Sequence, residues 1–145
     1  MLPEFLNVDL ELESNESLDR IAQEFGDRVH VLHNGPLQEI PYLLALEVYA
    51  GDDQDPESII EAFCDLIEAL SAKGKTIWRK ATARRFDIGI ESGTGVAKRF
   101  SALCLSLSSA TLKRIAALSA EVVITVYPPH PPEPKVKTKA KKKTK

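Results

Sequence analysis

Apolar and polar residues alternate near the start of the chain, and this pattern predicts a strand. Apolar side chains occupy every second position from Leu6 to Leu12, and polar or acidic side chains lie between them up to Glu13. A period of two places the two sets on opposite faces of a strand. We therefore expect one face in the core and an acidic face in water. A helix is expected next, over residues 18–25, because apolar residues recur there at helical spacing and Gly26 suits a helix end.

The clearest helical pattern covers residues 57–70. Asp55 can accept hydrogen bonds from the first free amides, and Pro56 fits the first helical position. Apolar residues then form a continuous stripe on one side of the helix. Gly74 is expected to end this region, and residues 76–78 to resume extended structure.

Further strands are expected at 29–32, 42–50, 86–90, 101–107 and 122–127. Turn residues at 33–36 and 92–95 separate them, and the second turn predicts a hairpin into residues 101–107. Ser108 or Ser109 is expected to cap a last helix.

Two segments of the chain resemble each other. Residues 6–32 and 100–127 each contain the sequence Leu-x-Arg-Ile-Ala, beginning at Leu18 and at Leu112, between a Ser-containing cap and a β-type run. This similarity predicts a duplicated strand–helix–strand (βαβ) unit. The element order becomes β-α-β-β-α-β-β-α-β. We expect an α+β, ferredoxin-like fold, with a mostly antiparallel sheet and three helices on one face, in a single domain over residues 1–127.

The net charge of −2 conceals an acidic body and a basic tail. Residues 1–134 hold 12 basic and 21 acidic side chains, a net of −9. Residues 128–134 are proline-rich and should form a stiff spacer. Residues 135–145 have little apolar surface, so this lysine-rich tail is expected to be disordered. Its lysines are Lys135, Lys137, Lys139, Lys141, Lys142, Lys143 and Lys145.

The cysteines and the hydropathy profile indicate an ordinary cytoplasmic protein. Cys64 and Cys104 lie in apolar stretches, on an expected helix and an expected strand, and are interpreted as core thiols. No apolar run approaches the roughly 18 residues of a membrane span, and no signal-peptide pattern is expected at the start.

No catalytic, cofactor or metal motif satisfies its structural requirements. Residues 72–76 resemble part of a phosphate-binding loop but lack its first glycine, and the loop closes a helix where the motif opens one. His30 and His33 have no third ligand near them in sequence. No nucleophile motif is present. We therefore expect a protein without enzymatic activity, cofactor or metal.

Two groups of residues could instead bind a macromolecule. Trp78 precedes several basic residues, as in a nucleic-acid platform, but one aromatic residue is more typical of a core. The acids of the first strand indicate a surface for a basic protein, or alternatively a solvated face that resists edge pairing. The candidate protein-binding residues are Asp9, Glu11, Glu13, Arg85, Asp87 and Glu91.

The last third of the chain resembles an uncharacterised bacterial domain family of unknown function (4279-like). The similar features are the strand, Leu-Ser cap and helix over residues 105–118 and the final strand at 123–127 that ends in Tyr127. The residue pattern of this family is similar over residues 86–127, and its order of elements is similar over residues 5–127. The early Trp-x-x-Gly segment of the family is missing here. Some members resemble immunity proteins encoded beside secreted toxins.

Three functional hypotheses follow. The first is a non-enzymatic interaction protein, of immunity type, whose acidic sheet face masks a basic partner. The second is a nucleic-acid-associated accessory protein that acts through its tail, where up to seven phosphate contacts would give weak, salt-sensitive binding. The third is a small enzyme whose site is assembled only by the fold.

Overall fold

The computed structural model describes residues 2–49, 54–93 and 102–129. They form an α+β structure with an open five-stranded mixed sheet and four α-helices, which confirms the expected class. In chain order the elements are β1 (Glu4–Ser14), α1 (Asp19–Phe25), a 3-10 turn (Gly26–Arg28), β2 (Val29–Leu37), β3 (Ile40–Val48), α2 (Pro56–Glu68), α3 (Ala72–Lys80), β4 (Ala83–Glu91), α4 (Ser109–Ala117) and β5 (Glu121–Tyr127).

The sheet has the strand order β2-β3-β1-β4-β5, so the first strand lies in the centre. β1 pairs antiparallel with both β3 and β4, and β2 pairs antiparallel with β3. Only the last pair, β4 with β5, is parallel. The expectation of a mostly antiparallel sheet is therefore confirmed, and β5 forms one of its two edges.

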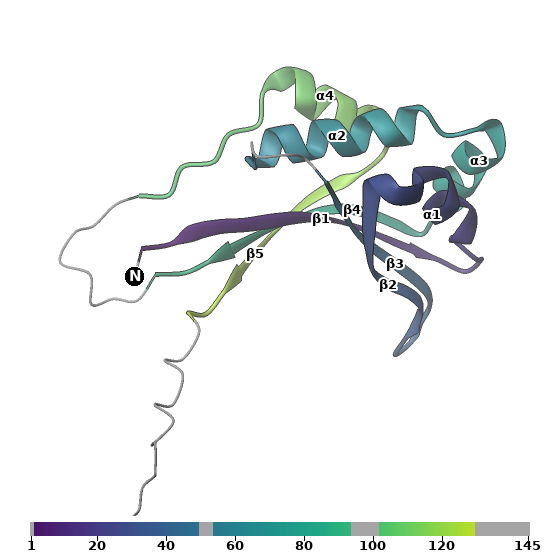
Figure 1. Cartoon of the computed structure of the whole chain (residues 1–145), viewed down its shortest axis with the longest axis horizontal. Coiled ribbons are helices and arrows are strands. Elements are labelled where there is room, and N and C mark those ends of the chain that lie inside the picture. The colour runs from purple at the N-terminus through teal and green to yellow at the C-terminus, as the bar shows by residue number, and fades with distance from the viewer. Residues whose placement is uncertain (1, 50–53, 94–101, 130–145) are drawn as a thin grey trace, which may run out of the picture.

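The core lies between the sheet and the helices, which Figure 1 shows above one face of the sheet. Val8, Leu10 and Leu12 of β1 are fully buried, in agreement with the alternation in the sequence. Phe63 of α2 packs against Phe86 of β4 with ring centroids 5.9 Å apart. Burying a side chain of this kind contributes about 1.5–3 kcal/mol, so these residues anchor α2 to the sheet.

The expected extended segment at residues 76–78 is wrong, because α3 covers this region. Ser71 is the N-cap of α3, and its hydroxyl accepts a hydrogen bond from the backbone N–H of Gly74 at 3.1 Å. Gly74 thus lies inside the first turn of α3. This helix was not expected, and it brings the number of α-helices in the described residues to four, where three were expected. Trp78 is only 4% exposed. The burial of its indole against the core outweighs the β preference of the sequence around it.

The expected hairpin into a strand at 101–107 is also wrong for the described residues. Residues 102–108 have no strand pairing, and β5 returns parallel to β4 after α4. A parallel return requires a crossover of a dozen or more residues, and the connection between Glu91 and Glu121 is long enough. The expected duplication therefore fails, since the second unit lacks the first strand of the pattern. The expected cap Ser108 is confirmed, because its hydroxyl accepts from the Thr111 backbone N–H at 3.2 Å.

The turn expected at residues 33–36 is wrong as well. β2 continues through these residues to Leu37, and the chain turns at Gln38, whose φ is 52°. Two irregularities in the β2–β3 register, between Val31 and His33 and between Gly35 and Leu37, accommodate the turn-type residues within the strand.

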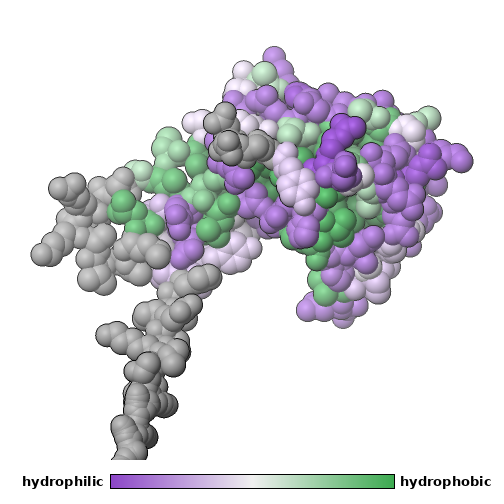
Figure 2. All heavy atoms as spheres, in the orientation of Figure 1, coloured by the Kyte–Doolittle hydropathy of each residue, from purple (hydrophilic) through white to green (hydrophobic). Residues whose placement is uncertain are grey.

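The helices leave one end of the sheet uncovered. Ile124 and Val126 of β5 lie opposite Ile88 and Ile90 of β4, on the core-facing side, yet they are 62% and 60% exposed. Figure 2 shows hydrophobic residues gathered at this end of the molecule, away from α3. β5 therefore presents exposed apolar side chains beside an open strand edge.

The two cysteines differ in their surroundings. Cys64 is buried in α2, as expected, whereas the expectation of a core thiol at Cys104 is wrong because this residue is exposed. Cys104 lies between Leu103 and Leu105 in an alternating segment whose leucines are the half-buried residues. Among the helices of the described residues, none has the length and apolar character needed to cross a membrane.

Candidate functional site on the open face of the sheet

Acidic side chains gather on the sheet face that carries no helices. They come from the three central strands. On β1 and β4 they lie between buried positions, so the same alternation that buries the apolar side chains turns these acids outward. We define this acidic face as Asp9, Glu11 and Glu13 of β1, Glu47 of β3 and Asp87 of β4.

Two carboxylates of the acidic face lie directly opposite each other. Asp9 of β1 and Asp87 of β4 are register partners in the antiparallel pair. Asp9 accepts a hydrogen bond from Asn7 Nδ2 at 3.0 Å, and Asp87 accepts one from Thr125 Oγ1 at 2.7 Å. Both partners are neutral, so the carboxylates remain uncompensated in the described part of the chain. Like charges placed directly across a sheet are destabilising.

Two groups on this face have raised pKa values, chiefly because they are partly buried and also because acids surround them. Partial burial, with added repulsion from Glu47, Glu11 and Asp87, raises the pKa of Asp9 from its ordinary 3.8 to about 6. Burial and the nearby acids also raise the pKa of the Tyr127 hydroxyl. Each group is shifted towards its neutral form, which is the response expected of a partly buried acidic group beside negative charge.

The other end of the acidic face is compensated within the chain. Arg85 of β4 donates from Nε to Glu11 at 3.4 Å and from Nη2 to Glu13. The predicted residues Glu11, Glu13 and Arg85 therefore form an internal ion-pair cluster. The free negative charge of the face is concentrated around Asp9.

The structure adds residues that the sequence reasoning missed. Asp9, Asp87, Glu47 and Tyr127 border a concavity of about 140 Å³ on this face. Glu47 could have been found as a lone acid at the end of the apolar β3. Tyr127 is 45% exposed, and only the parallel position of β5 brings it here. The predicted Glu91, by contrast, is only 8% exposed, at the last position of β4.

The acidic face is arranged for electrostatic attraction of positive charge. Within the described ranges, no three metal-ligating side chains converge on one point. A partly buried row of carboxylates attracts a cation, because bringing positive charge to Asp9 relieves repulsion already present in the folded chain.

The remaining sequence candidates lie elsewhere. His33 Nε2 is 3.1 Å from the carbonyl oxygen of Gly35, and His30 is exposed on β2. Trp78 belongs to the core, as expected, so its indole is not a stacking platform. The lysine-rich tail at 135–145 lies outside the described residues, as does most of the expected 128–134 spacer.

Comparisons with protein-family models, curated proteins and solved structures found no match to the chain.

Proposed function

We propose that the protein is a non-enzymatic interaction domain that binds a basic protein through the acidic face, in the manner of an immunity protein that masks its partner. The observation that carries the proposal is the register pair of Asp9 and Asp87. Two uncompensated carboxylates across adjacent strands lower the stability of the folded chain. An arrangement that costs stability is often found where function requires it.

The surroundings of the acidic face favour a protein over a small cation. Tyr127 borders the acidic concavity and is exposed on the same face of the sheet, on the edge strand β5. Protein interfaces combine an apolar or aromatic centre with a charged rim, and tyrosine is enriched in them. A partner with lysine or arginine beside an apolar patch would contact the carboxylates of the acidic face and the ring of Tyr127.

The test is co-purification of the full chain from its source cell, followed by identification of the partner. Replacing Asp9, Glu47 and Asp87 with Asn or Gln should abolish recovery of a basic partner, because the uncompensated charge is removed with little change in shape. Binding should also weaken as salt rises, since exposed charges are screened. A partner retained equally by this variant would overturn the proposal.

A matched control separates local from overall charge. Asp27, Glu39 and Glu61 are exposed acids outside the acidic face. Their triple replacement with Asn or Gln changes the net charge by the same amount and should leave binding unaffected. Equal loss in both triple variants would mean that only the total charge of the body matters.

We also propose a ferredoxin-like arrangement for the first four strands and membership of the 4279-like family. The strand order β2-β3-β1-β4, with antiparallel neighbours, supports the first part. The second rests on the residue pattern at 86–127. We propose a cytoplasmic location too, because the free thiols of Cys64 and Cys104 persist most readily in a reducing compartment.

The seven tail lysines support a second proposal, nucleic-acid association. Lysines that contact phosphates release counterions, so such binding is sequence-independent and strongly salt-sensitive. Truncation after Pro134 should abolish retention on DNA or RNA at low salt. Unchanged retention after truncation would exclude the tail as the cause.

A further inference from the structure

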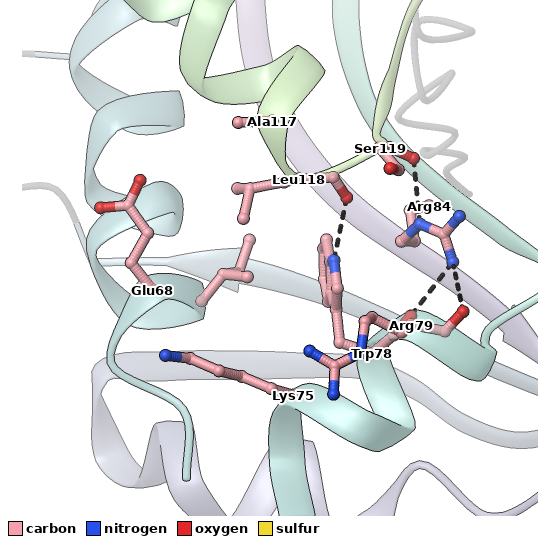
Figure 3. Close-up of a pocket in the computed structure, with 9 residues that line it drawn as sticks. Glu68, Lys75, Trp78, Arg79, Arg84, Ala117, Leu118 and Ser119 are labelled. Carbon is pink, nitrogen blue, oxygen red and sulfur yellow. Dashed lines mark hydrogen bonds between the residues drawn. The ribbon is translucent and has the colours of Figure 1, made fainter. Parts of the chain in front are cut away.

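A second concave site lies on the helical side of the molecule, away from the acidic face. It is a cavity of about 510 Å³ where α2, α3, the start of β4 and the end of α4 meet (Figure 3). Its volume falls within the roughly 300–1,000 Å³ that is typical of small-molecule sites. Nothing in the acidic-face proposal uses this cavity.

One side of the cavity is apolar and fixed in position. Ile67 of α2, Trp78 of α3 and Leu118 after α4 contribute to it. The Trp78 indole Nε1–H donates to the Leu118 carbonyl oxygen at 3.0 Å, which is drawn in Figure 3. This hydrogen bond satisfies the polar edge of the ring. The indole is thereby held as a rigid apolar wall.

The guanidinium of Arg84, which is held in place by backbone carbonyls, forms another part of the cavity lining. Arg84 Nε donates to the Ser119 carbonyl at 3.0 Å, and its Nη1 donates to the carbonyls of Ala81 at 2.7 Å and Trp78 at 3.1 Å. These contacts place a cation at the C-terminal end of α3, where a positive charge is favourable. No described residue accepts a hydrogen bond from Arg84 Nη2, so this nitrogen keeps its donors.

Two further cations border the cavity on the α3 side. Lys75 has no ion-pair partner among the described residues, and Arg79 makes only a long contact of 3.5 Å to Thr76 Oγ1. The acid on the opposite side, Glu68, is already bound by Arg114 at 2.8 Å and 3.0 Å. The cavity therefore carries a net positive charge, although the body of the chain is acidic.

We propose that this cavity binds a small organic anion with an apolar body. Lys75 and Arg79 would contact the anionic group, Arg84 Nη2 would offer further donors, and the apolar part would lie against Trp78. Cations that are not neutralised by the chain itself favour an anion, since a charge-assisted hydrogen bond is about twice as strong as a neutral one. The apolar wall excludes a ligand that is charged throughout.

The chain provides its own reporter, because Trp78 is its only tryptophan. Octanoate, a carboxylate on an apolar chain, is the probe, and 1-octanol is its uncharged counterpart. Titration of the full chain with octanoate should change the Trp78 fluorescence saturably and shift the NMR signal of its Nε1–H. Octanol should bind at least about tenfold more weakly, a difference of 1.4 kcal/mol. Equal binding of the two probes, or no response to octanoate in either signal, would overturn the proposal.

Variants test the assigned cations. The double variant Lys75→Gln, Arg79→Gln should weaken octanoate binding by about tenfold or more. The matched control is Lys73→Gln, Lys80→Gln, which removes two charges from the same helix outside the cavity and should change binding less than about twofold. Arg84 is left intact because it supports the fold. Equal weakening in both variants would attribute the effect to total charge and contradict the assignment.

Discussion

The carboxylate of Glu24 on α1 accepts two hydrogen bonds from Ser71, one from the backbone N–H at 2.7 Å and one from the hydroxyl at 2.6 Å. Because Ser71 also caps α3, this contact joins two helices that are distant in sequence. Arg20 Nε donates to the same carboxylate at 2.8 Å. The two bonds from Ser71, with help from Arg20, lower the pKa of Glu24 from its ordinary 4.5 to about 2.

Replacing Glu24 with Gln should lower the thermal midpoint near neutral pH. A carboxyl group whose pKa is lowered by folding stabilises the folded state above its ordinary pKa, and this contribution disappears as the pH falls through the folded value. The difference in thermal midpoint between the natural protein and the Glu24→Gln variant should therefore narrow as the pH falls from 4.5 to about 2. Thermal unfolding across this range measures the gap. A gap that does not change with pH would contradict the assigned role.

Gly74→Ala should destabilise the protein although alanine is the better helix former. A Cβ at this position would lie 2.9 Å from Glu24 Oε2 and 3.1 Å from Leu70 Cδ2. Alanine gains about 1 kcal/mol of helix propensity, whereas crowding of a packed site costs about 1–3 kcal/mol. We expect a net loss of about 1 kcal/mol in the free energy of unfolding, measured by urea denaturation. The loss should shrink when Glu24 is also replaced with Ala.

Asp9→Asn should stabilise the isolated protein near neutral pH. Folding raises the pKa of Asp9 from 3.8 to about 6, so the folded state binds more protons between these values and its stability falls as the pH rises through them. The asparagine keeps an oxygen that can accept from Asn7 and carries no charge. Its thermal midpoint should exceed that of the natural protein above pH 6, and the two should converge below pH 3.8.

A control for this prediction is Glu61→Gln, an exposed position on α2. Exposed substitutions of this kind usually change stability by less than about 0.5 kcal/mol. If the Asp9→Asn variant is less stable than the natural protein at neutral pH, the Asp9 carboxylate has a stabilising contact. That result would contradict an acidic face with uncompensated charge at Asp9.

The two cysteines should differ strongly in their reaction with a thiol reagent. Cys104 is exposed, whereas Cys64 is fully buried and burial raises the pKa of its thiol to about 11. The thiolate is the reactive form. In the native protein one thiol should react quickly, and Cys104→Ser should remove that fast phase. Both thiols should react in denaturant. Rapid labelling of Cys64 in the native state would contradict its place in the core.

The sequence predicted α2 well because its signals are local. Asp55 accepts from the Ser58 backbone N–H at 2.8 Å, and Pro56 occupies the first helical position, as expected. α3 was missed because Gly74 was interpreted as a helix end. The N-cap of α3 is Ser71, whose backbone N–H donates to Glu24 of α1. A contact across 47 residues leaves no periodic signal in the sequence.

The candidate site was predictable only in part, for a similar reason. Alternation alone placed Asp9 on the outward face. Its position opposite Asp87 depends on the register between β1 and β4, which a single strand pattern does not specify. The contribution of Tyr127 depends on the parallel return of β5. Residues 92–95 predicted a hairpin and not this parallel return, so Tyr127 was not among the candidate residues.

Zero-length cross-linking tests the central claim most directly, because a carbodiimide joins only carboxylates and lysine amines that are in contact. Applied in the source cell, it should couple partner lysines to Asp9, Glu47 or Asp87. The triple variant that replaces these three carboxylates with Asn or Gln should lose the partner. Cross-links from the partner that fall instead on Asp27, Glu39 or Glu61, with none on the acidic face, would contradict the account.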